Sequence, residues 1–158
     1  MKRKSIVVIG MVVGCLMMVA GAAWAVDMPG RANGTLKVGN LVWLLNPNSC
    51  LGKMNWDSAV SRARSLASGQ CGLTDGSKAG DWRLSNTEEL LYICENKGLF
   101  QNIGNGDYWS SDTGKYRSPQ GGLEDGAEVV VFFLGCDQKG LRMKTTNHHY
   151  SWPVRSGP

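Results

Sequence analysis

The spacing of the apolar residues changes several times along the chain, and each spacing predicts a helix or a strand. Residues 35–45 predict two short strands around a Gly-Asn turn. The second of these, 41–45, is apolar at every position, so we expect it to be buried on both faces or at a sheet centre. Residues 46–49 are turn formers and end it. Asn55 then caps a helix whose apolar positions recur at helical spacing down to Gly69.

A second helix is predicted after residues 81–85, whose alternation indicates a short extended segment. Asn86 with Glu89 has the pattern of a capping box. Ser85 with Glu88 has the same pattern one residue earlier, so the helix start is defined to within one residue. Its apolar stripe consists of Leu90, Ile93 and Cys94.

The second half of the chain predicts strands separated by one long polar segment. The predicted strands are 107–112, 127–134, 141–146 and 149–155. Residues 113–126 are polar and contain several glycines, so we expect a loop without a fixed shape. Pro153 places the last strand at an edge or an irregular position. Strands, two helices and strands again form an α+β order, with the helices on one side of a mostly antiparallel, twisted sheet.

The first 25 residues have the three parts of a bacterial secretory signal peptide. Cations at 2–4 precede the apolar run 6–20, and Ala-Trp-Ala at 23–25 is a cleavage site. An uncleaved anchor and a lipoprotein signal are the alternatives, but the apolar run continues past Cys15, which argues against lipidation. We therefore expect an exported protein in the periplasm, on the cell surface or outside the cell.

Removal of 25 of the 158 residues leaves 133, the length of one domain. Residues 26–34 form a short, loosely held lead, and 35–158 form the domain. The cleaved segment carries 3 of the 17 basic residues, so 14 remain against 13 acidic ones and the net charge falls from +4 to +1. So balanced a domain is not expected to bind nucleic acid. It also has no second apolar segment that could span a membrane.

Four cysteines remain in the exported chain, an even number that predicts two disulfides. Cys50 and Cys71 flank the first predicted helix, and a bond between them would join its two adjoining loops. That leaves Cys94 on the second helix to pair with Cys136 at the end of a strand. Spacing alone permits three connectivities, and this one is our prediction. No CxxC spacing is present, so a zinc site is not expected.

Five sequence blocks follow one another over nearly all of residues 26–158. They are 41–44 (Leu-Val-Trp-Leu), 54–56 (Met-Asn-Trp) with Ala59, 80–84 (Gly-Asp-Trp-Arg-Leu) with Glu89 and Leu90, 108–111 (Tyr-Trp-Ser-Ser) and 152–155 (Trp-Pro-Val-Arg). In these blocks the chain resembles the C-terminal domain family of the Legionella collagen-like protein. It departs from the family pattern at Ser85, where proline is usual, and at Leu41-Val42, which replaces Leu-Met.

The resemblance implies a C-type-lectin-like fold. In that fold the N- and C-terminal strands pair, and a long loop region between the central strands carries the ligand surface. It also implies exported proteins that act as adhesion or binding modules, with sulfated polysaccharide as the best-known partner class. The family has no shared catalytic residues to transfer to this chain.

Eight motif residues are expected to hold the fold rather than a ligand. They are Trp43, Trp56, Trp82, Arg83, Glu89, Trp109, Trp152 and Arg155. Motif tryptophans in such a domain usually form its core. We expect the two arginines to pair with Asp81 or Glu89.

Two surfaces are candidates for binding a glycan, a polyanion or a surface protein. The first is the 105–125 loop, with Asn105, Tyr108, Asp112, Lys115, Tyr116 and Arg117. The second is a basic strip of Lys139, Arg142, Lys144, His148, His149 and Arg155, from which Arg142 and Lys144 point the same way on a strand. A polyanion would lie across these two cations. An ordinary solvated loop and strand face are the alternatives.

We expect no catalysis, no cofactor and no metal. The tripeptide 118–120 (Ser-Pro-Gln) lacks the carboxylate with which lectins of this fold class bind calcium, and Glu124, Asp125 and Glu128 are too few ligands. The related sulfatase-modifying enzymes use unpaired cysteines, whereas each of the four cysteines of the exported chain has a plausible partner. Besides this less favoured enzyme, the alternative is a structural subunit or partner-protein module of a surface assembly.

Overall fold

The structure is a computed structural model that describes residues 33–100, 102–132 and 135–157. The expected signal peptide, Cys15 and residues 26–32 of the lead lie outside the described residues. Asn33 and Gly34, the end of the lead, are held: the Asn33 carbonyl accepts from the Thr74 N–H (3.0 Å) and the Gly34 carbonyl from the Leu45 N–H (3.0 Å). Within these residues, no helix is both long enough and apolar enough to cross a membrane.

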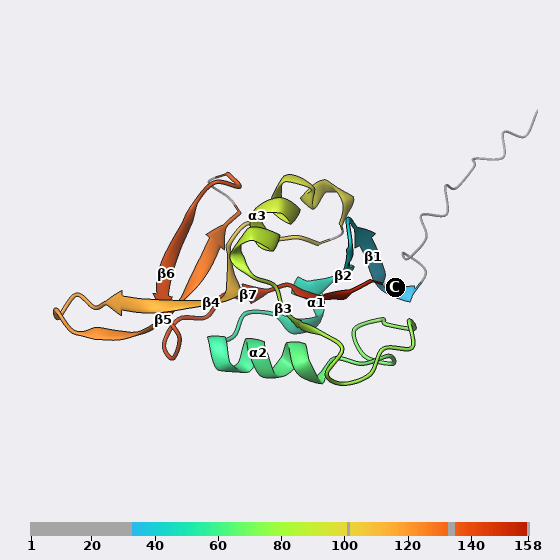
Figure 1. Cartoon of the computed structure of the whole chain (residues 1–158), viewed down its shortest axis with the longest axis horizontal. Coiled ribbons are helices and arrows are strands. Elements are labelled where there is room, and N and C mark those ends of the chain that lie inside the picture. Colours follow the sequence, from blue (N-terminus) through green and yellow to red (C-terminus); the bar gives the residue numbers. More distant parts are fainter. Residues whose placement is uncertain (1–32, 101, 133–134, 158) are drawn as a thin grey trace, which may run out of the picture.

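The described residues form an α+β fold with two four-stranded sheets (Figure 1). In chain order the elements are β1 (Thr35–Val38), β2 (Leu41–Leu44), α1 (Pro47–Leu51), α2 (Trp56–Ser65), β3 (Arg83–Leu84), α3 (Thr87–Glu95), the 3-10 helix η2 (Lys97–Leu99), β4 (Asp107–Arg117), β5 (Leu123–Val131), β6 (Lys139–Met143), β7 (Tyr150–Ser151) and β8 (Pro153–Ser156). The sheets have the orders β1-β2-β8-β3 and β6-β5-β4-β7. Pairing is antiparallel except between β4 and β7, which are parallel. The strands form two sheets, whereas a single sheet was expected.

The two long helices cover opposite faces of the strands, not one face as expected. Figure 1 shows α3 above the strands and α2 below them. Neighbouring residues of β4 explain this arrangement, because successive side chains of a strand point to opposite faces. Tyr108 packs in the cluster that contains Ile93 of α3. Trp109 packs in the cluster that contains Ala59 and Ala63 of α2.

The first sheet joins the two ends of the domain. β2 pairs antiparallel with β8, with Val42 opposite Arg155 and Trp43 opposite Val154. The last strand was expected at an edge or an irregular position: β8 lies between β2 and β3 and not at an edge, but the strand is irregular, because it is interrupted at Trp152. Pro153 is tolerated because it is the first residue of β8, directly after the break that separates β8 from β7.

Indole rings make up much of the core. Four tryptophans are at most 1% exposed: Trp43, Trp82, Trp109 and Trp152. The Trp152 ring meets Trp43 and Phe100 edge-on, with centroids 5.6 and 4.7 Å apart. Its Nε1–H donates to the Leu44 carbonyl at 2.9 Å. These four residues lie in the core, as expected, whereas Trp56 is only partly buried.

The local signals at both long helices are confirmed at their N-termini. The Asn55 side chain accepts from the Ser58 N–H at the start of α2. At α3 the capping box is complete: Asn86 accepts from the Glu89 N–H at 2.8 Å, and Glu89 accepts from the Asn86 N–H at 2.9 Å. This settles the start of α3 at Asn86 rather than Ser85.

Two other local predictions are wrong. Residues 46–49 follow the end of β2 as expected, but they do not form a turn, because Pro47 begins the short helix α1. The first long helix stops at Ser65, four residues before Gly69, because Leu66 adopts an extended conformation that buries its side chain beside Trp82.

Both predicted disulfides are present. Cys50 is bonded to Cys71, and Cys94 is bonded to Cys136, each with a Cα–Cα distance of 5.4 Å. The first links α1 to the segment after α2. The second links α3 to the turn between β5 and β6.

Candidate binding surface

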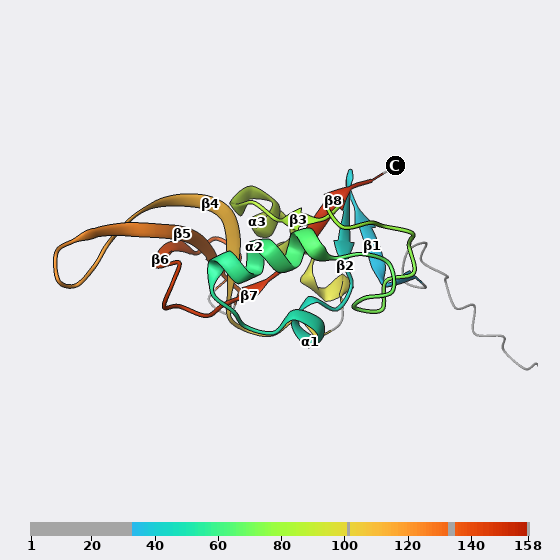
Figure 2. The same cartoon turned by 90° about the horizontal axis from the view of Figure 1, so that it is seen from below.

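The predicted loop 113–126 is a β-hairpin, which corrects the sequence-based expectation. β4 and β5 pair in register from Thr113 opposite Ala127 to Arg117 opposite Leu123, and residues 118–122 make the turn. Polar residues and glycines indicated a loop, but the cross-strand pairing satisfies the backbone regardless of side-chain polarity. We call residues 113–126 the distal hairpin. It projects beyond the rest of the molecule in two perpendicular views (Figures 1 and 2).

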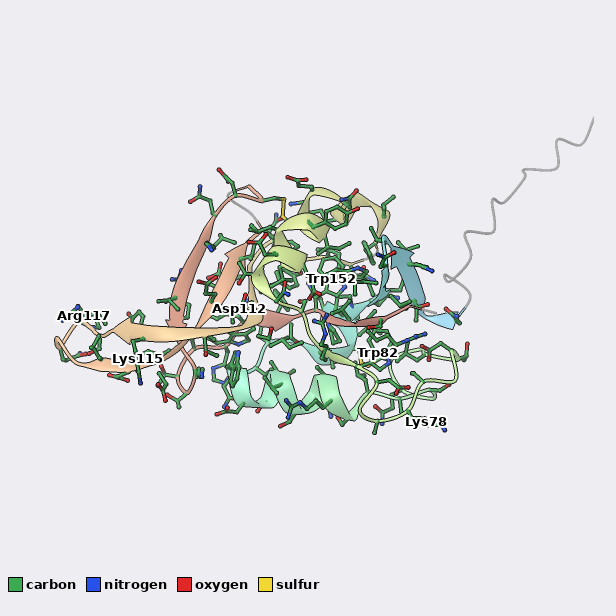
Figure 3. All side chains as sticks on the ribbon, viewed as in Figure 1. Lys78, Trp82, Asp112, Lys115, Arg117 and Trp152 are labelled. Atoms are coloured by element: carbon green, nitrogen blue, oxygen red, sulfur yellow. A yellow bond between two sulfur atoms is a disulfide. The ribbon has the colours of Figure 1, made fainter. Side chains whose placement is uncertain are left out.

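A bulge at the root of the hairpin attaches it to α3. The register shifts between Trp109 and Thr113, so the three residues 110–112 of β4 lie opposite the single residue Glu128 of β5. The Asp112 carboxylate there accepts from the Thr87 N–H, in the first turn of α3, at 2.9 Å. Asp112 is one of the expected ligand residues, and the structure shows that its carboxylate caps α3 and holds the root of the hairpin against this helix (Figure 3).

Two glycines allow the strands and β6 to pack closely at the middle of the hairpin. Gly114 lies opposite Gly126. A Cβ on Gly114 would be 3.2 Å from Leu141 Cδ2, and a Cβ on Gly126 would be 2.9 Å from the Tyr116 Cβ. Leu141 and Tyr116 therefore occupy the space that the side chain of a larger residue at position 114 or 126 would need. Tyr116 is half-buried as a result.

The outer end of the hairpin presents polar side chains and one apolar side chain to solvent. Lys115 Nζ is 2.7 Å from Asp125 Oδ1, with 67% and 71% of the two side chains exposed. The hydrogen bond from Lys115 holds the pKa of Asp125 below its usual value. Leu123 is 61% exposed, the most of any large hydrophobic residue that the structure describes. Lys115 and Arg117 extend from this end of the molecule in Figure 3.

Tyr108 does not belong to the candidate surface, which corrects its assignment as a ligand residue. Its side chain is completely buried between Phe132 and Trp152. The hydroxyl accepts from Asn48 Nδ2 at 2.7 Å and donates to the Gly104 carbonyl at 3.2 Å. Burial raises the pKa of Tyr108 to about 12. Asn105 is exposed in the segment before β4, away from the distal hairpin in sequence.

Internal partners engage most of the cations of the predicted basic strip. Arg142 Nη2 is 3.5 Å from Asp107 Oδ2. Lys144 Nζ lies 4.2 Å from the centre of the Trp56 ring. The other contacts are Lys139 with Glu128 (3.5 Å), His149 with Asp107 (3.8 Å) and Arg155 with Asp75 (3.0 Å). Burial lowers the pKa of His149, and His148 is exposed.

The motif arginines have structural partners. Arg83 binds Glu89 through two parallel hydrogen bonds of 2.8 and 2.6 Å, as expected. Arg155 pairs with Asp75, a residue that was not among the expected partners Asp81 and Glu89. Burial raises the pKa of Glu89, but the hydrogen bonds from Arg83 and from the backbone N–H of Asn86 outweigh burial and hold that pKa below its usual value.

Asp75 is the centre of a buried polar network. Its Oδ1 accepts from the Ser77 hydroxyl at 2.7 Å, and that hydroxyl oxygen accepts from Trp82 Nε1 at 3.0 Å. The Arg155 guanidinium also lies over the Trp82 ring, 5.5 Å from its centre. Only 1% of the Asp75 side chain is exposed. The network ties the segment between α2 and β3 to β8.

No protein-family model, characterised protein or solved structure matches the chain. The chemistry of the described residues is therefore the basis on which a function can be proposed. All four cysteines of residues 33–157 are bridged. Among the described residues, no three or more His, Cys, Asp or Glu side chains are grouped to hold a metal ion.

The structure also contains concave sites that the sequence did not indicate. One lies beside the Cys50–Cys71 bond and is lined in part by Arg62. A second lies between Asp75, Asp81 and the end of β8. A third lies between α2, β3 and β4, where Trp56 and Arg64 form part of the wall. The lining residues come from distant parts of the chain, so no local sequence pattern marks them.

Proposed function

We propose that this chain is an exported, non-catalytic binding module that recognises a glycan through the distal hairpin. The observation that carries the proposal is the projection of residues 113–126 beyond the body of the molecule, with their outer side chains exposed. Such side chains contribute little to folding, since exposed ion pairs such as Lys115–Asp125 are worth at most about 1 kcal/mol. A rigid scaffold that presents an exposed segment is typical of binding proteins.

The chemistry of the hairpin favours hydrogen-bonding recognition over attraction to a polyanion. Lys115 and Arg117 are balanced there by Glu124 and Asp125. Tyr116 adds an aromatic ring, and the planar groups of the charged residues supply donors and acceptors for hydroxyl groups. The disulfides support an oxidising, exported location. The bridged cysteines support a non-catalytic role, because a disulfide sulfur supplies no thiolate nucleophile.

We also propose that the fold is C-type-lectin-like. The pairing of β2 with β8, near the two ends of the domain, supports this proposal. The position of the distal hairpin between the central strands of the chain supports it as well, since ligand surfaces of that fold lie in this region.

The test is a glycan array probed with the oxidised chain and with a variant that carries Lys115→Ala, Tyr116→Ala and Arg117→Ala. We expect the variant to lose at least about tenfold in affinity, the cost of a few hydrogen bonds to charged groups. The matched control carries Arg62→Ala, Lys78→Ala and Tyr92→Ala, three exposed residues of the same types outside the hairpin. Unchanged binding by the hairpin variant, or equal loss in the control, would contradict the proposal.

One observation favours a second candidate, a partner-protein module of a surface assembly. Leu123 is exposed at the hairpin end, and contact with a partner protein would remove this apolar side chain from water. Under this alternative, Leu123→Ser abolishes capture of a surface protein. Under the glycan proposal, the same substitution leaves array binding within about twofold, because a Leu side chain donates no hydrogen bond.

A further inference from the structure

A cavity of about 200 Å³ lies where α2, β3 and β4 meet. Its lining consists of Trp56, Val60, Arg64, Arg83, Leu84 and Ser111. We propose that this site, the α2 cavity, binds a carboxylate attached to a small apolar group. The proposal is independent of the glycan proposal, because the cavity shares no residue with the distal hairpin.

The apolar wall of the α2 cavity is held in place by contacts on the protein side. Trp56 Nε1–H donates to the Ser110 carbonyl at 2.8 Å, and Lys144 Nζ lies 4.2 Å from the centre of its ring. Leu84 is 3% exposed, and Val60 packs against the same core cluster. An apolar group that enters the cavity therefore leaves water without requiring the wall to rearrange.

The charged side of the α2 cavity has one uncompensated cation. Glu89 neutralises Arg83 through the two parallel hydrogen bonds described above, and these also fix the direction of its guanidinium. Arg64 is exposed, and its guanidinium has no carboxylate partner among residues 33–157. One free guanidinium matches one carboxylate, which it can bind through two hydrogen bonds.

The size of the α2 cavity limits the apolar group. Pockets for drug-sized ligands measure roughly 300–1,000 Å³. The volume here, about 200 Å³, is smaller and corresponds to one ring or a short branched chain. Two sources share this chemistry: a free carboxylic acid, and the C-terminal residue of a peptide that ends in an apolar side chain.

The experiment is an NMR titration of the oxidised, ¹⁵N-labelled chain with 4-methylpentanoate and with acetyl-Gly-Leu. The corresponding amides, 4-methylpentanamide and acetyl-Gly-Leu-amide, are the controls that lack the charge. We expect the Trp56 indole N–H and the Ser111 amide to shift and saturate with at least one acid. Saturation with the free acid alone, or with the peptide alone, supports the proposal and identifies the source. Absence of saturation with both acids, or equal shifts with the amides, would overturn it.

A pair of variants tests the role of Arg64. Arg64→Gln is expected to weaken binding of the acid about tenfold, because it removes a charge-assisted hydrogen bond. Arg62→Gln is the matched control, since Arg62 is exposed on the same helix but lines the separate cavity beside the Cys50–Cys71 bond. Both residues are exposed, so both variants should fold. Equal affinities of the two variants would refute the assignment.

Discussion

Single residues in this protein often have a partner that is distant in sequence, and Asp75 is the clearest case. Its carboxylate receives hydrogen bonds from Ser77, two positions along, and from Arg155, eighty positions along. Burial raises the pKa of Asp75, but the hydrogen bonds from Ser77 and Arg155 outweigh burial and hold it below its ordinary value of 3.8. The charged form is therefore part of the folded structure.

We predict that Asp75→Asn lowers the free energy of unfolding at pH 7 by about 1–3 kcal/mol, since it leaves charged and polar donors unpaired. A carboxylate whose pKa is lowered by folding stabilises the protein above its unfolded pKa, and that contribution disappears as the pH falls through the folded pKa. The difference between wild type and variant should therefore shrink progressively below about pH 3.8. Urea unfolding at pH 7 and at pH 3 measures it.

The matched control for this prediction is Asp137→Asn, which changes an exposed carboxylate without a hydrogen bond or ion pair in the described structure. It should leave the free energy of unfolding within about 0.5 kcal/mol of wild type. A gap between wild type and Asp75→Asn that stays constant from pH 7 to pH 3 would contradict the assigned charge.

Among the elements, the β4–β5 hairpin depends on glycine for its geometry. Gly126→Ala places a Cβ 2.9 Å from the Tyr116 Cβ and 3.1 Å from the Arg142 carbonyl oxygen, and neither atom is the end of a flexible side chain that could move aside. We predict a loss of about 1–3 kcal/mol, the usual cost of overpacking. Hydrogen exchange should show faster exchange of amides 113–127 with the α3 amides unchanged.

Gly122 provides the control in the same hairpin. A Cβ there would be 3.5 Å from the Ser118 hydroxyl, an ordinary contact distance. Gly122→Ala should therefore leave the exchange rates and the free energy of unfolding unchanged. Equal effects of the two substitutions would show that the close approach at Gly126 is not what shapes the hairpin.

Elements with local signals could be predicted from the sequence, and those that depend on distant pairing could not. α3 was placed correctly because Asn86 and Glu89 cap each other within three residues. The distal hairpin was expected to be a loop, because its polar and glycine residues show no burial pattern and its stability comes from pairing across a turn. Tyr108 was misassigned for a related reason: its burial requires Phe132 and Trp152, which are remote in sequence.

In the candidate surfaces, too, local features could be predicted from the sequence and those that depend on distant contacts could not. The outer residues Lys115 and Arg117 were identified correctly as exposed, since nothing in their pattern called for burial. The internal pairing of the basic-strip cations was not predictable, because partners such as Asp107 and Asp75 come close to them only in the folded chain. The α2 cavity could not be read from the sequence either, since three separate elements form it.

Across the whole molecule, the two disulfides lie on opposite sides of the strands, one on the α2 side and the other on the α3 side. Cys50–Cys71 closes a sequence separation of 21, and Cys94–Cys136 closes one of 42. Cys94 is also buried in the largest core cluster, on the α3 side. Loss of the second bond therefore releases a longer loop and also disturbs better-packed surroundings.

We predict that Cys94→Ala with Cys136→Ala destabilises the fold by about 4 kcal/mol, against about 3 kcal/mol for Cys50→Ala with Cys71→Ala, by the chain-entropy relation. Urea unfolding of the two double variants provides the comparison, and each serves as the control for the other. An equal or reversed order would show that loop length does not determine what each bond contributes.

The union of β2 with β8 places the beginning and the end of the described domain at one pole, while the distal hairpin occupies the other (Figure 1). A carrier fused to either terminus therefore leaves the hairpin unobstructed. Molecules attached through a terminus to a bead or an electrode would all present the distal hairpin to the solution. The domain is in this respect ready for display without further engineering.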